Sequence, residues 1–220
     1  MACGSNCCGT ADFFGDRVAR RNLRKYRRGG PFGATKRLLE ALHKAPGPKE
    51  TLLDVGGGVG VIAHELLARG ASRAALVDAS PAFLAAAREE SERRNTDDRL
   101  DLRLGDAVEL SDDVPTADVV TLDKVICCYV DMEALLGVTA SRARRLMGLV
   151  YPRDDWWVRA AVAVGNRMLE WRGSEFRSYI HPNAAIEDAL RRGGLVPRTR
   201  QRGAYWVIAV FERAEAATTS

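Results

Sequence analysis

A glycine-rich junction constrains the fold of this chain more than any other feature of its sequence. Residues 52–60 read LLDVGGGVG: an apolar strand over 51–55 runs directly into glycines, and an apolar helical pattern over 59–70 follows. Glycine allows a tight turn with positive φ, and its missing side chain lets a ligand approach the backbone at a helix N-terminus. The junction therefore predicts a strand–turn–helix unit that binds a ligand.

The spacing of these glycines narrows the kind of ligand. Gly56, Gly58 and Gly60 depart from the dinucleotide pattern G-x-G-x-x-G, which requires a small residue where this chain has Val61. Asp54 precedes the glycines, so the full pattern is D-x-G-x-G-x-G. Two other interpretations stay open at this point: glycines that serve only the turn, and a nicotinamide dinucleotide site.

Strand and helix patterns alternate along the rest of the chain. We expect strands over 51–55, 73–80, 99–107, 117–126, 144–152 and 205–213. We expect helices over 12–28, 34–45, 59–70, 81–95, 132–143 and 184–194. Ser80 is the expected N-cap of the fourth helix, with Pro81 at its first position. Such alternation predicts an α/β fold, a mostly parallel sheet with helices on both faces.

One segment does not fit this alternation. Residues 153–182 are too many for a simple connection, and they contain Trp156, Trp157 and Trp171. We expect a helical lid insertion over the carboxyl edge of the sheet, where ligands bind in such folds. Whether Trp156 and Trp157 contact a ligand or a membrane surface stays open.

The glycine pattern resembles motif I of the class I S-adenosylmethionine-dependent methyltransferases. In that family the acid at Asp54 orients the methionine part of the cofactor, and Asp78, which ends the second strand, takes the ribose hydroxyls. LGDA matches the third motif, in which Asp106 meets the adenine amino group, and ADVVTLD matches the fourth. The resemblance implies S-adenosylmethionine as cofactor, S-adenosylhomocysteine as product, and these cofactor-binding residues: Tyr26, Asp54, Gly56, Gly58, Gly60, Asp78, Ala79, Asp106, Ala107 and Asp123.

The resemblance also implies a Rossmann-like sheet of seven strands, of which the last is antiparallel. Beyond the core motifs, the string LDKVICCYVDMEALL…VYPRDDWWVR…YIHP looks like the magnesium-protoporphyrin O-methyltransferase branch and its bacterial relatives. That branch carries His-Tyr-Pro where this chain has Cys128, Tyr129 and Val130. Porphyrin methyl ester formation is therefore one alternative, beside O-methylation of another flat or anionic small molecule.

Methyl transfer to a hydroxyl, amine or carboxylic acid can use a general base. His181 is the preferred candidate because it follows the lid and would face the pocket, whereas His43 and His64 lie on helices away from the strand ends. Tyr129, just past the fourth strand, could touch the substrate or orient the methyl group. Arg153 could hold a carboxylate with two hydrogen bonds.

The cysteines lie in only two places. Cys127 and Cys128 end the fourth strand, where they are either substrate-facing residues or small apolar core residues. Cys3, Cys7 and Cys8 form a C-x₃-C-C cluster that matches no standard zinc pattern. If the two groups converged, their thiolates could hold a soft metal or a metalloid such as arsenite for methylation. A non-catalytic thiol sensor of metals or redox state on the same fold is a third alternative.

Length and charge set the remaining expectations. The 220 residues predict a Cys/Gly head over 1–10, cap helices over 11–48, a methyltransferase domain over 49–213 and a tail over 214–220. No signal core or membrane-spanning run is present, so we expect a cytoplasmic protein. The basic run over 17–28 lacks interleaved aromatic residues, which argues against nucleic acid and leaves an anionic acceptor or peripheral membrane contact open. The sequence leaves the oligomeric state open.

Overall fold

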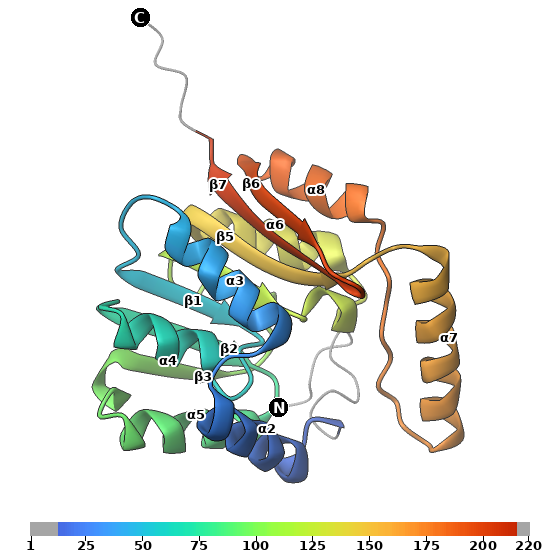
Figure 1. The fold of residues 1–220 in the computed structure, drawn as a ribbon, viewed down its shortest axis with the longest axis horizontal. Coiled ribbons are helices and arrows are strands. Elements are labelled where there is room, and N and C mark those ends of the chain that lie inside the picture. The colour runs from blue at the N-terminus through green and yellow to red at the C-terminus, as the bar shows by residue number, and fades with distance from the viewer. Residues whose placement is uncertain (1–12, 215–220) are drawn as a thin grey trace, which may run out of the picture.

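A seven-stranded sheet organises the computed structural model, which describes residues 13–214 (Figure 1). The strands are β1 (Thr51–Val55), β2 (Arg73–Asp78), β3 (Leu100–Leu104), β4 (Ala117–Asp123), β5 (Ala143–Pro152), β6 (Leu195–Arg202) and β7 (Trp206–Arg213). Their order across the sheet is β3-β2-β1-β4-β5-β7-β6. β7 runs antiparallel to both of its neighbours, and the pairs among β1 to β5 are parallel. The expected mostly parallel sheet with an antiparallel last strand is confirmed.

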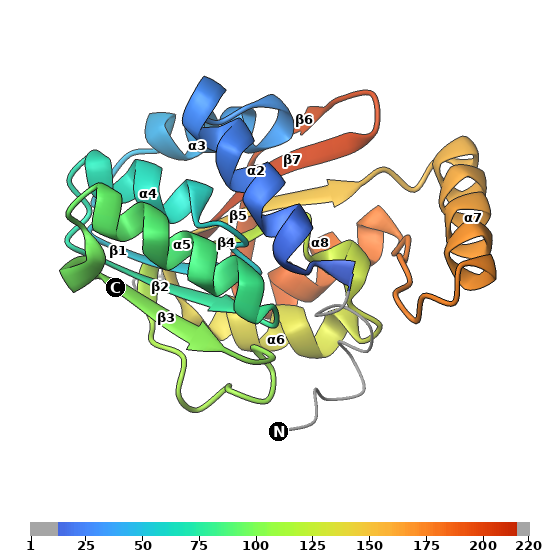
Figure 2. The same cartoon turned by 90° about the horizontal axis from the view of Figure 1, so that it is seen from below.

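Helices cover both faces of this sheet, as Figure 2 shows from below. The helices are α2 (Asp16–Gly29), α3 (Gly33–Lys44), α4 (Val61–Ala68), α5 (Pro81–Arg93), α6 (Met132–Arg142), α7 (Trp156–Trp171) and α8 (Asn183–Arg192), with short 3₁₀ turns η1 (Asp97–Arg99) and η2 (Ile126–Cys128). Side chains of α3, α4 and α5 share one core with the sheet, and those of α6 and α8 share the other. No helix among the described residues is long and apolar enough to cross a bilayer.

Several element boundaries differ from the sequence expectation, each for a local reason. Helix α2 begins at Asp16, inside the range expected for a helix over 12–28, because Gly15 has an extended backbone with ψ of −175°. The third and fourth strands end at Leu104 and Asp123, earlier than expected, because Gly105 and Lys124 have positive φ and turn the chain away. The expected Ser80 cap is confirmed, since its Oγ accepts a hydrogen bond from the Phe83 amide at 3.2 Å.

β6 is the strand that the apolar pattern does not reveal. Seven of its eight residues, LVPRTRQR, are exposed, and only Leu195 is buried. Its pairing with β7 is interrupted by a shift in register between Pro197 and Thr199, as is typical of an edge strand that contains proline. A strand at a sheet edge with no buried face lacks the alternation from which strands are recognised.

Candidate active site

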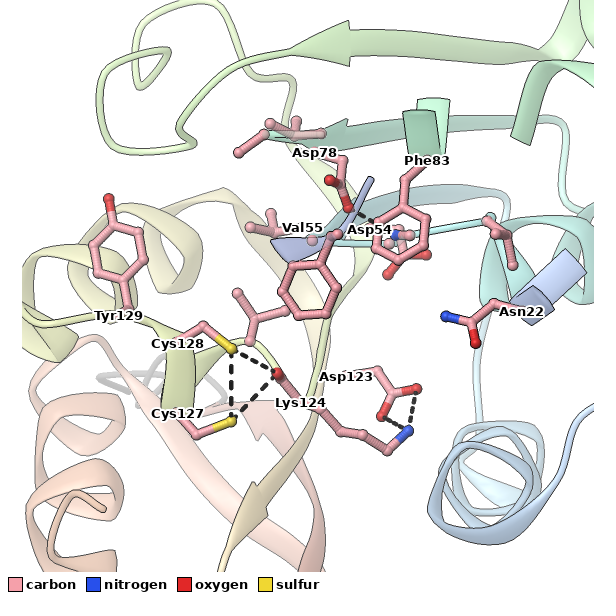
Figure 3. Close-up of a pocket in the computed structure, with 18 of the residues that line it drawn as sticks. Asn22, Asp54, Val55, Asp78, Phe83, Asp123, Lys124, Cys127, Cys128 and Tyr129 are labelled. Atoms are coloured by element: carbon pink, nitrogen blue, oxygen red, sulfur yellow. Dashed lines mark hydrogen bonds and ion pairs between the residues drawn. The ribbon is translucent and has the colours of Figure 1, made fainter. Parts of the chain in front are cut away.

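A cavity of about 550 Å³ opens at the carboxyl ends of β1, β2 and β4. β1 lies between β2 and β4, so the chain reverses its direction of progress across the sheet at this point. Ligands bind at such switch points in open α/β sheets. Figure 3 shows side chains from four parts of the chain pointing into this cavity, which we call the pocket.

The glycine loop forms the floor of the pocket between β1 and α4. Gly56, Gly58 and Gly60 have φ of +63°, +58° and +76°, a region that residues with side chains rarely adopt. A Cβ atom on Gly56 would also lie 2.4 Å from Cγ2 of Val125, which follows β4. Glycine is therefore required at residue 56 both by the backbone angle and by the approach of the next strand.

Asp78 ties the second strand to this loop. Its Oδ2 accepts a hydrogen bond from the Gly58 amide at 2.9 Å, and its Oδ1 accepts one from the Ser80 amide at 2.8 Å. Burial raises the pKa of Asp78, while these two amides partly offset that rise. Each carboxylate oxygen has a second lone pair, so the group can accept further hydrogen bonds from a ligand in the pocket.

Asp54 is the most deeply placed acid of the site, at 1% exposure. Thr121 on β4 donates its hydroxyl to Asp54 Oδ1 at 2.6 Å, whereas Oδ2 is buried and has no hydrogen-bond partner among the described residues. Burial raises the pKa of Asp54 to about 7. A buried polar atom without a partner beside a cavity marks a position where a bound ligand could supply one.

Asp106, two residues after the end of β3, is the third acid that lines the pocket. Its Oδ1 accepts hydrogen bonds from the Val108 amide at 2.8 Å and from the hydroxyl of Tyr129. Ala79 and Ala107 line the pocket nearby, so apolar walls flank this carboxylate. The Tyr129 hydroxyl is therefore bonded to Asp106 near the end of β3, and Tyr129 also lines the pocket.

We expect Tyr129→Phe to weaken binding of an adenosine ligand about tenfold, because Asp106 loses the donor that orients it. The protein should stay folded, since the ring remains packed. Fluorescence titration with S-adenosylhomocysteine would measure the affinity, with Tyr205→Phe as a control outside the pocket lining. Equal affinities for both variants would contradict a positioning role for Tyr129.

A second polar cluster joins β4 to α3; Asp123 was expected among the cofactor-binding residues, whereas Lys124 and Thr35 were not predicted from the sequence. Lys124 Nζ lies 3.0 Å from Asp123 Oδ1 and 2.8 Å from Thr35 Oγ1, and Thr35 donates its hydroxyl to Asp123 Oδ2 at 2.5 Å. All three residues line the pocket. Lys124 has φ of +66°, a strained angle for a lysine, and such strain is concentrated at functional sites. A single lysine after a strand gives no sequence signal, because Thr35 is far away in the sequence and comes close to Lys124 only when the chain folds.

Cys127 and Cys128 both line the pocket, on the 3₁₀ turn after β4. Their Sγ atoms lie 3.9 Å apart, and both approach the backbone carbonyl of Lys124, at 3.4 Å and 3.7 Å respectively (Figure 3). The neighbouring thiol of Cys128 lowers the pKa of Cys127, against the effect of burial. Cys3, Cys7 and Cys8 lie outside the described residues. Between residues 13 and 214, no group of three or more His, Cys, Asp or Glu side chains could hold a metal ion.

Aromatic side chains close the open side of the pocket. Phe13 stacks on Phe176 with ring centroids 4.3 Å apart, and Phe14 meets Phe176 edge-on at 5.4 Å and Phe83 at 5.5 Å. These rings join the chain before α2, the segment after α7 and helix α5. Trp206 from β7 lines another wall. The sequence gives no periodic signal for this cluster, because its members come from loops far apart in the chain.

The proposed lid contributes to the pocket, but not through its tryptophans. Leu169, Phe176 and Ser178 from the insertion line the cavity, whereas Trp156, Trp157 and Trp171 do not. They are exposed on α7, which lies at one end of the molecule in both views. The sequence left open whether Trp156 and Trp157 contact a ligand; in the structure they lie outside the pocket lining, because α7 presents another face to the cavity.

Two other predicted side chains are engaged outside the pocket lining. His181 Nε2 lies 2.9 Å from the carbonyl oxygen of Tyr129, so the ring is held against the backbone. Arg153 forms an ion pair with Asp155 at 2.5 Å. Neither His181 nor Arg153 lines the pocket, and the geometry favours Lys124 over both as the group that meets an acceptor.

Tyr26 of α2 packs against α4, where its ring stacks on that of His64 with centroids 6.2 Å apart. Tyr26 lines the pocket, as expected, and donates its hydroxyl to Glu65 Oε1 at 2.8 Å. Burial raises the pKa of Tyr26, so it stays protonated. His64 is buried outside the pocket lining, and burial lowers its pKa to about 4. His64 is thus a neutral core residue.

Comparison with known proteins identifies the fold around this pocket. Residues 52–147 match the family model described as "Methyltransferase domain". The chain is 34% identical over 106 residues to ribosomal protein L11 methyltransferase from Alteromonas mediterranea, an alignment covering 44% of this chain and 36% of the relative. The same protein from Yersinia pestis is 30% identical over 121 residues, 52% of this chain and 41% of the relative. The chain thus spans about two fifths of the length of these relatives.

Solved structures match over most of the chain. Magnesium protoporphyrin IX methyltransferase from Synechocystis PCC 6803 with bound SAH superposes with a TM-score of 0.69 at 20% identity, covering 93% of this chain and 98% of that one. An O-methyltransferase family protein from Burkholderia thailandensis gives a TM-score of 0.70 at 17% identity, covering 94% and 63%. Residues 52–147 are therefore similar to a methyltransferase domain, and the chain has the fold of the class I S-adenosylmethionine-dependent methyltransferases.

Proposed function

We propose that this protein transfers a methyl group from S-adenosylmethionine to a small, flat acceptor, most simply to an oxygen atom that carries or can acquire negative charge. The observation that carries the proposal is that one cavity has two chemically different halves. Three buried acids and the glycine loop line one half, and an apolar wall with the cluster of Lys124, Asp123 and Thr35 lines the other. Such a division suits a polar cofactor placed end to end with an apolar acceptor.

The cofactor half fits S-adenosylmethionine on three observations of the structure. Asp78 presents carboxylate lone pairs to the pocket for ribose hydroxyls, and Asp106 lies between Ala79 and Ala107 for the adenine ring. The unpartnered Oδ2 of Asp54 would face the methionine end, through a donor of the ligand or a bridging water. The bound cofactor supplies a methyl group on a positively charged sulfur.

The acceptor half fits an apolar ring with a polar or anionic edge. Phe176, Trp206 and Cys127 supply apolar wall, and the ammonium of Lys124 is the cation at its polar end. The acceptor oxygen would attack the methyl carbon in line with the carbon–sulfur bond, whose electrons return to sulfur. The protein contributes alignment of the two reactants and exclusion of water. Lys124, held by Asp123 and Thr35, would stabilise negative charge on the acceptor oxygen.

We expect Lys124→Met to lower kcat/KM for an anionic or phenolic acceptor about 100-fold while cofactor affinity changes little, because the ion pair lies in the acceptor half. Lys124→Arg keeps the charge and should retain more activity. Initial-rate measurements over a range of acceptor concentrations would separate KM from kcat. An equal loss in both variants would mean that a positive charge at this position is not sufficient and that the site requires the lysine side chain itself.

Methylation of a thiol-bound metalloid is a second candidate that one observation favours. The two thiols of Cys127 and Cys128 lie side by side on the pocket wall, 3.9 Å apart, and the structure lowers the pKa of Cys127. Adjacent thiolates bind soft metalloids such as trivalent arsenic. In this reaction arsenic would take the place of oxygen as the atom that attacks the methyl carbon.

A methyl-transfer assay with radiolabelled cofactor distinguishes these candidates. The panel would contain magnesium protoporphyrin, a set of planar phenols and aromatic carboxylic acids, and arsenite. Product from a planar acceptor that survives Cys127→Ser and Cys128→Ser would support O-methylation. Product from arsenite that disappears in those variants, or in a Cys3/Cys7/Cys8→Ser variant, would establish the metalloid reaction.

Binding of the cofactor alone tests the claim on which both enzymatic candidates depend. Calorimetric titration with S-adenosylmethionine and S-adenosylhomocysteine should give micromolar affinity. No measurable binding of either compound to the folded protein would overturn both enzymatic candidates. The thiol sensor would then remain as the function. Binding of Cd²⁺ to the wild-type protein, but not to the cysteine variants, would identify it.

A further inference from the structure

Helix α7 has one face that the protein uses and one that it leaves exposed. On the inner face, Val158 is buried and Leu169 lines the pocket. Asn166 fixes this face to the returning chain through two hydrogen bonds with the backbone of Ser178, at 2.8 Å and 2.9 Å. The position of the helix on the molecule is therefore set mainly by this inner face, with one further edge-on contact between Trp157 and Tyr205, whose ring centroids lie 6.4 Å apart.

The outer face of α7 carries an apolar stripe at coiled-coil spacing. Its members follow steps of four, three, four and three residues: Trp157, Ala161, Val164, Met168 and Trp171. All five are exposed, Val164 at 61% and Trp171 at 76%. Trp156, beside the stripe, is 81% exposed. Together these side chains leave on the order of 600 Å² of apolar surface in water, which is at the upper limit for one patch on a monomeric protein.

This stripe is nearly symmetric about its central residue. Trp157 and Trp171 lie seven residues before and after Val164, and Ala161 and Met168 lie on either side of it. In an antiparallel pair of such helices, each tryptophan at one end would meet the tryptophan at the other end of its partner. The small Ala161 would face the large Met168, and the two Val164 side chains would meet at the twofold axis. Knobs-into-holes packing requires such small-against-large complementarity.

We propose that the protein forms a twofold symmetric dimer in which the outer faces of two antiparallel α7 helices pack against each other. Two copies of the stripe would bury about 1,200 Å², the lower end of the range for stable, specific interfaces. Both views show α7 at one end of the molecule (Figures 1 and 2), and the stripe on it is exposed. The dimer goes beyond the proposed activity and does not depend on it.

The charges around the stripe favour a second copy over an anionic membrane. Helices that lie in a membrane surface are rich in Lys and Arg on the polar face. The cations on α7 are Arg159 and Arg167, and Arg167 is paired with Glu170 at 3.0 Å. The near symmetry of the stripe matches another α7, whereas a lipid surface would require no such order.

Sedimentation velocity of the full chain tests the dimer. At about 100 µM the wild-type protein should sediment with twice its monomer mass of 24.1 kDa and should dissociate toward about 1 µM. Val164→Glu places two carboxylates at the twofold axis and should raise the dissociation constant at least 100-fold. Arg159→Glu introduces the same side chain at another exposed position of α7, outside the stripe, and should leave the dimer intact. Circular dichroism would verify that both variants are folded.

A crosslinking experiment tests the contact at the twofold axis. In a Cys3/Cys7/Cys8→Ser background under mild oxidation, Val164→Cys should form a disulfide-linked dimer, whereas Arg159→Cys and the background protein should not. A monomeric wild-type protein at 100 µM would overturn the proposal. So would a blue shift of tryptophan emission and co-sedimentation with phosphatidylglycerol vesicles that Val164→Glu abolishes, because the stripe would then bind lipid.

Discussion

Replacing Asp78 by asparagine should weaken the binding of S-adenosylmethionine at least 100-fold. The carboxylate accepts amide hydrogen bonds from Gly58 and Ser80 and retains lone pairs that point into the pocket. Hydrogen bonds to a charged acceptor contribute about 1.5–3 kcal/mol each, and asparagine loses the charge and turns an NH₂ group toward one of these donors. Both the ligand contact and the anchoring of the glycine loop are affected, so this variant should have the largest effect on cofactor affinity.

Calorimetric titration with S-adenosylhomocysteine would measure this loss. Asp101→Asn is the matched control, because Asp101 lies on β3 with a half-exposed side chain that pairs only with Arg103 near the surface. The control should bind as the wild-type protein does. An affinity within threefold of wild type for Asp78→Asn would show that the ribose does not lie at this carboxylate.

Asp54→Asn should make the ligand-free protein more stable at pH 8 than the wild-type protein and about equally stable at pH 4. Burial raises the pKa of Asp54 from 3.8 to about 7. The folded protein therefore holds this proton more tightly than the unfolded chain does. The stability that the protonated carboxyl contributes is complete below about pH 4 and is lost as the pH rises through about 7. A difference of three pKa units corresponds to about 4 kcal/mol, which is an upper limit for the gain in the variant.

Urea unfolding at several pH values would measure the effect as the difference between the two proteins. Other titrating groups, such as His64, are present in both proteins and cancel in this difference. Asparagine keeps the oxygen that accepts from Thr121, so the hydrogen bond at 2.6 Å should survive. If the two stability curves run parallel from pH 4 to pH 8, Asp54 titrates normally and its burial has no energetic consequence.

The cofactor half of the pocket could be predicted from the sequence because its residues are close together in sequence or follow strands directly. The glycines come directly after β1, and Asp78 and Asp106 follow at the ends of β2 and β3. The carboxyl ends of parallel strands meet at one edge, so residues at strand ends gather there whatever the details of packing. Tyr26, Cys127 and Cys128 were also expected near ligands, and they line the pocket.

In the half that we assign to the acceptor, Thr35, Lys124, Phe176 and Trp206 could not be predicted, because these residues come together only when distant segments pack. Thr35 is 88 residues from Asp123, and nothing in either sequence neighbourhood indicates their hydrogen bond. The orientation of α7 could not be predicted either. Its tryptophans were possible ligand contacts in the sequence, but Asn166 and Val158 hold the helix with another face toward the protein. A helix with apolar residues on two sides does not show in its sequence which side it will bury.

The sequence by itself determined the α/β class, the methyltransferase motifs and the strand ends that carry the three acids, because periodicity and turn chemistry are local properties. Only the tertiary structure decided that Lys124 enters the pocket, that His181 is held on the Tyr129 backbone and that the tryptophans of α7 face outward. These outcomes depend on contacts between segments far apart in the chain. Local secondary-structure preferences do not determine such contacts, because their free energies depend on how the whole core packs.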